Sequence, residues 1–81
     1  MNNVNHALAL RIEELLKQKN MTRYRLAMNS GITHSTLNNI MRESISDSLF
    51  ATVILIAGGF DMTVSEFTDS PLFLEDNLQL Y

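Results

Sequence analysis

Cysteine is absent from this chain of 81 residues, and two classes of site are absent with it. Disulfide bonds and thiolate metal sites both need cysteine, and the two histidines, His6 and His34, lie too far apart in sequence to suggest a local metal motif. No apolar run approaches the roughly 18 residues that span a bilayer, and the first residues lack the cationic start and apolar core of a signal peptide. We therefore expect a cytoplasmic protein with no metal, no cofactor and no membrane partner.

The sequence also lacks the groups of residues that catalysis needs. It has no Gly-rich phosphate loop, no cysteine nucleophile and no pair of carboxylates set beside a histidine. His34 and Ser35 are neighbours, but adjacent positions on a helix diverge by roughly 100° and no orienting acid lies within the motif. The sequence therefore predicts a protein that is not an enzyme, with no small-molecule ligand evident. Its length allows one modest core, so we expect a single domain.

Basic residues are missing outside one part of the chain. All six lie between positions 11 and 42, where only Glu13 and Glu14 oppose them, although the whole chain has a net charge of −3. They are Arg11, Lys17, Lys19, Arg23, Arg25 and Arg42. An acidic total argues against a nucleic-acid partner, because phosphate contacts supply most of the non-specific affinity. A basic face on an acidic body can nevertheless orient a protein towards DNA; the alternative is a solvated surface whose charges segregated by chance.

Residues 22–42, TRYRLAMNSGITHSTLNNIMR, predict two short helices joined by a tight turn. Thr22 and Thr33 can each accept a hydrogen bond from the first turn of the helix that follows, as N-cap residues do. A small side chain at Ala27 lets the two helices approach closely, and Gly31 can take the positive φ that ends the first of them. This arrangement is a helix-turn-helix.

The second of these helices is expected to have a polar outer face. Its buried side consists of Leu37, Ile40 and Met41, at the spacing i, i+3, i+4. At roughly 100° per residue, the other side chains point away from this apolar stripe or flank it. They are His34, Ser35, Thr36, Asn38, Asn39 and Arg42. Hydroxyl, amide, imidazole and guanidinium groups of this kind can contact base edges and phosphates.

A longer helix is expected before this motif. Asn3 or Asn5 can cap it, and Asn20 ends it after Lys19. Its apolar residues recur at i, i+4, i+7 and i+8, which is the spacing of one buried helix face. They are Leu8, Ile12, Leu15 and Leu16. This helix is expected to serve as a scaffold.

Two further segments follow the motif. Residues 49–60, LFATVILIAGGF, form a continuous apolar run, and the pattern by itself leaves a buried strand and a buried helix open. Thr63 and Glu66 have the spacing of a capping box, which would start a short last helix. Ser70 and Pro71 then prevent that helix from continuing.

The sequence resembles the Cro/repressor-type helix-turn-helix proteins of phage and bacteria, also called the xenobiotic-response-element family. The similarity runs from about Arg11 to Phe67 and is carried by RIEELLKQKN, TRYRLAMNSGIT, STLNNIM and GGFDMTVSEF. It implies an all-α, five-helix, lambda repressor-like domain over residues 1–69, in which residues 49–60 are the fourth helix. Residues 70–81 are then a short C-terminal extension.

The resemblance also implies a function. Members of the family bind double-stranded operator DNA in a sequence-specific way as homodimers, with the helix at residues 34–41 in the major groove, and regulate transcription, here as a repressor that occludes a promoter. Base contacts are implied for Thr33, His34, Ser35 and Asn39, and backbone contacts for Thr22, Arg23, Arg25, Thr36, Asn38 and Arg42. Among these residues, Asn39 is the best suited to a bidentate contact with adenine.

Two departures from the family pattern weaken this reading. Arg23 stands where the family usually has glutamine, although it can still meet a phosphate. Residues 43–48, ESISDS, replace a loop that is usually basic, so Glu43 and Asp47 are expected to repel the DNA backbone. The alternative function is a protein-interaction module of the same fold, such as an antitoxin, antirepressor or adaptor, with weak or no DNA binding.

Apolar residues are more numerous than one small domain can bury. The expected fourth helix is apolar nearly all round, and the extension carries more apolar residues, whose pattern fits a short strand and a short helix equally. We expect this surface to be covered by a second copy of the chain or by the extension, folded over the fourth helix. The residues concerned are Leu49, Ile54, Leu55, Leu72, Phe73, Leu78, Leu80 and Tyr81.

Overall fold

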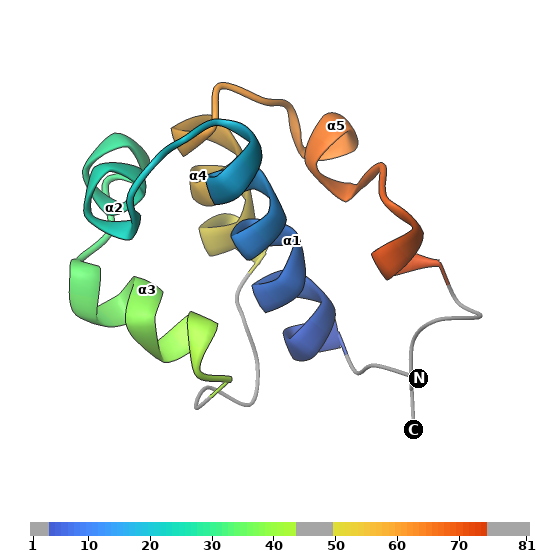
Figure 1. The fold of residues 1–81 in the computed structure, drawn as a ribbon, viewed down its shortest axis with the longest axis horizontal. Helices are drawn as coiled ribbons and strands as arrows, with labels where there is room; N and C mark the ends of the chain where they lie inside the picture. The colour runs from blue at the N-terminus through green and yellow to red at the C-terminus, as the bar shows by residue number, and fades with distance from the viewer. Residues whose placement is uncertain (1–3, 44–49, 75–81) are drawn as a thin grey trace.

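The computed structural model describes residues 4–43 and 50–74, and all regular structure within these ranges is helical (Figure 1). The helices are α1 (Val4–Gln18), α2 (Arg23–Ser30), α3 (His34–Met41), α4 (Phe50–Gly59), α5 (Val64–Thr68) and a short 3-10 helix, η1 (Pro71–Phe73). The predicted all-α fold with five α-helices is confirmed. Residues 50–59 of the apolar run, for which the sequence pattern left a strand and a helix open, form the helix α4.

Helix α1 lies in the middle of the molecule, between α3 on one side and α5 on the other (Figure 1). Its predicted buried face is confirmed, because Leu8, Ile12, Leu15 and Leu16 are all buried. The largest fully buried side chains come from every α-helix and from the turn after α4. They are Ile12, Leu26, Leu37, Ile56, Phe60 and Phe67. Burying a side chain of this size stabilises a fold by about 1.5–3 kcal/mol, so a single shared core holds the helices together.

Residues with positive φ follow α1, α2, α3 and α4 and reverse the chain. They are Asn20 (52°), Gly31 (73°), Glu43 (57°) and Asp61 (59°). After α1, the Asn20 N–H donates to Lys17 O and the Met21 N–H donates to Leu16 O, which satisfies the last carbonyls of the helix. Asn20 therefore ends α1 as predicted. At the other end, Asn5 lies inside α1 and does not cap it, and Asn3 lies outside the described residues.

Helices α2 and α4 pack closely because Gly59 has no side chain. A Cβ atom at this position would overlap Ser30 Oγ and lie 3.0 Å from the Leu26 side chain. The Ser30 hydroxyl is buried there, and it has no hydrogen-bond partner among the described residues. The Asn29 side chain adds a hydrogen bond to the Gly59 carbonyl at 3.4 Å. The position of α2, and of the motif that it opens, therefore depends on a glycine in α4.

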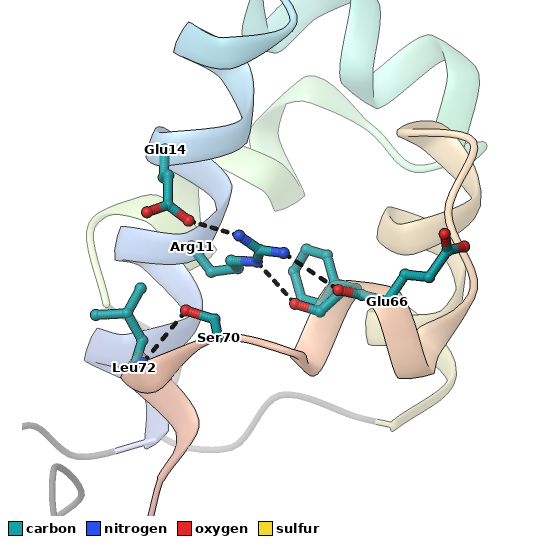
Figure 2. Close-up of polar contacts among 6 residues, drawn as sticks. Arg11, Glu14, Glu66, Ser70 and Leu72 are labelled. Carbon is teal, nitrogen blue, oxygen red and sulfur yellow. Dashed lines mark hydrogen bonds and ion pairs between the residues drawn. The ribbon is translucent and has the colours of Figure 1, made fainter.

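Arg11 joins α1 to the end of α5 (Figure 2). Its Nε donates to Phe67 O at 2.7 Å, its Nη2 donates to Glu66 O at 3.2 Å, and its Nη1 pairs with Glu14. The guanidinium also lies 6.0 Å from the centre of the Phe67 ring. Arg11 thus satisfies carbonyls at the C-terminal end of α5. The expectation that it belongs to one basic face with the other cations is wrong.

The first residues of the C-terminal extension pack on the domain. Ser70 caps η1 by accepting a hydrogen bond from Leu72 N at 3.2 Å, and Pro71 occupies the first helical position, where its missing N–H costs nothing (Figure 2). Phe73 lies 6.2 Å from Phe67, ring centre to ring centre, and η1 contacts α1. Residues 75–81 lie outside the described residues, so the placement of Leu78, Leu80 and Tyr81 against α4 or a second copy stays a prediction.

Candidate nucleic-acid interface

Helices α2 and α3 begin at threonines and are joined through a left-handed glycine. Thr22 Oγ1 accepts from Arg25 N at 3.1 Å, and Thr33 Oγ1 accepts from Thr36 N at 3.0 Å. Gly31 has φ 73°, and the next N–H, from Ile32, donates to a carbonyl of α2. The predicted caps and turn are therefore confirmed, and they fix the angle at which α3 leaves α2.

Helix α3 buries its apolar stripe and exposes its polar face. Leu37 and Ile40 are buried, and Met41 is half-buried against the core, as predicted. The residues predicted to contact DNA lie at the surface: Thr22, Arg23, Arg25, Thr33, His34, Ser35 and Arg42 are exposed, and Thr36, Asn38 and Asn39 are half-buried. The hydroxyl of Thr33 also donates to Thr36 Oγ1 at 2.8 Å, so these two side chains mainly secure the start of α3.

Arg23 connects the three helices at this surface. Its Nη1 donates to Asn38 Oδ1 of α3 at 3.3 Å, and its Nη2 lies 3.5 Å from Glu13 Oε2 of α1. Both charged side chains remain partly exposed, so water and salt screen their attraction and the ion pair adds little to stability. The ion pair matters mainly for geometry, because it holds the Arg23 guanidinium close to Asn38 of α3.

His34, at the first position of α3, contacts two neighbours. The ring of Tyr24 meets it edge-on at 6.2 Å between ring centres, and Asn38 Nδ2 lies 3.5 Å from its Nδ1. Tyr24 is 63% exposed and was not among the predicted site residues. The position of Tyr24 between Arg23 and Arg25 in the sequence could have indicated that it belongs to this site. Its contact with His34 could not be predicted, because it depends on how α2 and α3 cross.

Asn39 and Arg42 form a second pair on α3. Arg42 Nη2 donates to Asn39 Oδ1 at 2.8 Å. The two residues are close because i and i+3 positions lie on one face of a helix, and the long arginine side chain turns back along α3. Two neighbouring asparagines of α3, Asn38 and Asn39, therefore each accept a hydrogen bond from an arginine.

Charge at the end of α3 differs from the expectation. Glu43, which was expected to repel DNA, has its Oε2 at 2.8 Å from His6 Nδ1 of α1 and forms an ion pair when His6 is protonated. Asp47, the second acidic residue expected to repel DNA, lies outside the described residues. Arg11 is bound to the carbonyls of α5. Fewer cations are therefore available at the surface of α2 and α3 than the sequence suggested.

A second surface lies on α4 and is apolar. Phe50, Ile54 and Leu55 are 68%, 45% and 46% exposed, respectively, and we call these three residues the α4 face. Helix α4 carries no charged residue. Of the other residues predicted for this surface, Leu72 and Phe73 are half-buried at η1, and Leu49 lies outside the described residues.

Within residues 4–43 and 50–74, no group of His, Asp and Glu side chains is arranged to hold a metal ion. None of the helices described is both long and apolar enough to cross a bilayer.

Comparisons with known proteins bear on this site. The sequence profile of the helix-turn-helix family matches residues 12–67, which include α2, α3 and the caps between them. A crystal structure of the prophage Lp1 protein 11 superposes with a TM-score of 0.77, at 25% sequence identity, over 88% of this chain and 93% of that chain. No curated protein matches the sequence.

Proposed function

Because the chain belongs to the Cro/C1-type helix-turn-helix family of DNA-binding proteins, we propose that it binds one specific operator in double-stranded DNA, with α3 in the major groove. We propose further that it does so in the cytoplasm as a homodimer and represses transcription by occluding a promoter.

The observation that carries this proposal is the outer face of α3. It is polar, it lies at the surface, and two of its side chains are held by hydrogen bonds, Asn38 by Arg23 of α2 and Asn39 by Arg42. Side chains fixed in advance lose less entropy when they bind, which favours recognition of one sequence. His34, Ser35 and Asn39 are the proposed base contacts, with Thr33 at the leading end of the helix.

The proposed backbone contacts come from the start of α2 and from α3 with the residue that follows it. The N-terminal end of α2 presents backbone N–H groups and the positive end of its helix dipole, and phosphates bind well at such ends. The residues proposed for these contacts are Thr22, Arg23, Arg25, Thr36, Asn38 and Arg42.

A homodimer would read both halves of an operator and would also cover the apolar α4 face. One helix-turn-helix reads only half a site, and two recognition helices must lie about 34 Å apart to enter successive major grooves. The α4 face is the apolar surface that a second copy could cover. The same face favours the second candidate function, a protein-interaction module in which another protein covers α4 and DNA binding is weak or lost.

Selection from a random duplex library with the pure protein at low salt distinguishes the two functions. Enrichment of an inverted repeat is the expected result, because a two-fold dimer reads two equal half-sites. A pool that stays random after repeated rounds would contradict operator binding and favour the protein-interaction module.

A further inference from the structure

Tyr24 is exposed in the middle of the surface that is proposed to bind DNA. It lies in the first turn of α2 between Arg23 and Arg25, two proposed backbone contacts, and it is 63% exposed. A side chain that the core covers so little adds little to the stability of the fold. Its ring instead meets that of His34, a proposed base contact at the start of α3.

The two rings form an aromatic pair between α2 and α3. Their centres are 6.2 Å apart and their planes are inclined at 66°, which is a T-shaped arrangement. Aromatic rings prefer such a geometry at separations of about 4.5–7 Å, because the positive edge of one ring meets the negative face of the other. The contact with Tyr24 therefore favours one tilt of the His34 imidazole over others.

Asn38 holds the same imidazole by one of its nitrogens. A guanidinium has only N–H donors, so Arg23 meets the amide oxygen of Asn38, at 3.3 Å. The amide nitrogen of Asn38 then lies 3.5 Å from His34 Nδ1, and the other ring nitrogen, Nε2, points away from Asn38. A hydrogen bond of this length is weak and does not fix the ring by itself. The Tyr24 ring supplies the second contact.

From this geometry we infer that Tyr24 is a positioning residue for base recognition. It holds the His34 imidazole in the orientation in which Nε2 meets a base edge, and it thereby sets how strongly the protein prefers one base pair at that position. A ring that is held before binding loses less entropy on binding, and orientations that would fit a wrong base pair are less accessible to it. This inference rests on the proposed function, because His34 reads a base only if α3 enters the major groove.

The test starts from the operator that the intact protein selects. The base pair read by His34 is the one at which His34→Ala abolishes the preference, measured as the ratio of the affinities for the selected operator and for operators changed at that pair. Tyr24→Leu removes the aromatic ring and should lower this ratio about two- to tenfold, the factor that corresponds to the energy of an aromatic pair. Tyr24→Phe keeps the ring and should retain the ratio.

Two comparisons separate positioning from a direct contact between Tyr24 and DNA. In the His34→Ala background, Tyr24→Leu should have no further effect on the preference at any base pair, because Tyr24 acts through His34. Met28→Ala is the matched control: Met28 is 55% exposed and lies one turn further along the same face of α2, so its removal should leave the ratio unchanged.

The protein without DNA gives an independent readout. In the native chain, nuclear Overhauser effects should connect the ring protons of Tyr24 and His34, and the couplings between the Hα and Hβ protons of His34 should report a single rotamer. In Tyr24→Leu these couplings should move towards the average of several rotamers. The free energy of unfolding, from urea denaturation, should stay close to the native value because Tyr24 is exposed.

The outcomes distinguish this inference from the proposed function. Additive effects of Tyr24→Leu and His34→Ala, a loss of preference in Tyr24→Phe, or His34 couplings that are the same with and without the Tyr24 ring would each overturn the inference while operator binding stands. An operator at which His34→Ala changes no preference would do so too. A selection that enriches no sequence would overturn the proposed function and the inference with it.

Discussion

At the scale of single residues, the contact between α2 and α4 depends on Gly59 and not on its neighbour Gly58. A Cβ atom at Gly59 would overlap Ser30 Oγ and approach Leu26, whereas a Cβ atom at Gly58 would meet nothing within 4 Å. Both glycines lie in the last turn of α4, so the helix-forming advantage of alanine over glycine is similar at the two positions. The difference between the two substitutions therefore mainly measures the packing contact.

We expect Gly59→Ala to destabilise the protein by about 1–3 kcal/mol through overpacking, and Gly58→Ala to stabilise it by about 0.5–1 kcal/mol. Urea denaturation followed by circular dichroism gives both free energies of unfolding. In the double variant with Ser30→Ala, the cost of Gly59→Ala should shrink, because the hydroxyl that the new methyl group meets is gone. Equal effects at positions 58 and 59 would mean that α2 does not rest on Gly59.

Arg11 and Arg25 are predicted to differ in their effects on DNA binding. Arg25 is exposed on α2, while Arg11 is buried against α5. Each phosphate contact releases counterions, so Arg25→Ala should flatten the slope of log affinity against log salt by about one unit and leave the sequence preference unchanged. Arg11→Ala should leave the slope unchanged but lower stability, because the Phe67 carbonyl loses the Arg11 donor and the Glu66 carbonyl keeps only the Asp69 N–H. A flatter slope for Arg11→Ala would place that residue at the DNA after all.

At the scale of the elements, the start of α5 should respond to acid. Thr63 and Glu66 form the predicted capping box, in which Thr63 N donates to Glu66 Oε1 at 2.9 Å and Glu66 N donates to Thr63 Oγ1 at 3.1 Å. Hydrogen bonds from the backbone and then the side chain of Thr63 lower the pKa of Glu66 below its ordinary value of 4.5. The ionised carboxylate is thus the form that the folded state prefers.

A pKa that is lower in the folded state gives stability that is present above the unfolded value and is lost as the pH falls through the folded value. We therefore expect the free energy of unfolding to decrease as the pH falls below 4.5, and part of this decrease to vanish in Glu66→Gln, which cannot ionise. Glu14→Gln, on α1, is a control for removing a carboxylate elsewhere. Urea titrations at a series of acidic pH values would check this, and identical pH profiles for the native chain and Glu66→Gln would contradict it.

The elements also show what could be predicted from the sequence. The caps at Thr22, Thr33 and Thr63 and the turn at Gly31 were predictable because each depends on hydrogen bonds within a few residues of chain. So was the amphipathic stripe of α3, because helix geometry alone determines which residues share a face.

The long-range polar contacts were not predictable. Arg11 meets Phe67 across 56 positions of sequence, and His6 meets Glu43 across 37. The residues next to Arg11 and His6 in the sequence do not indicate these partners, so the sequence shows only that the segment from 11 to 42 is basic. The contacts that orient Asn38 and Asn39 were missed for a related reason: spacing places a side chain on a face but does not say which end of an amide points outward.

At the scale of the whole molecule, the α4 face should decide the state of assembly. We expect sedimentation equilibrium in the micromolar range to show a mass near twice the 9.2 kDa of the chain. Ile54→Glu should give monomers without unfolding the protein, because Ile54 is already partly exposed and a charge on it is costly only when a second copy covers it. Ser65→Glu, an exposed position on α5, is the matched control. A native chain that is monomeric at every concentration would contradict the dimer.

The ion pair between Glu13 and Arg23 has a consequence for engineering. Glu13 belongs to α1, yet through Arg23 it helps to hold Asn38 on α3. A library that varies only α3 would leave this support unchanged and restrict the orientations that new side chains can adopt. Redirecting the protein to a different operator should therefore succeed more often when position 13 is randomised together with the recognition helix.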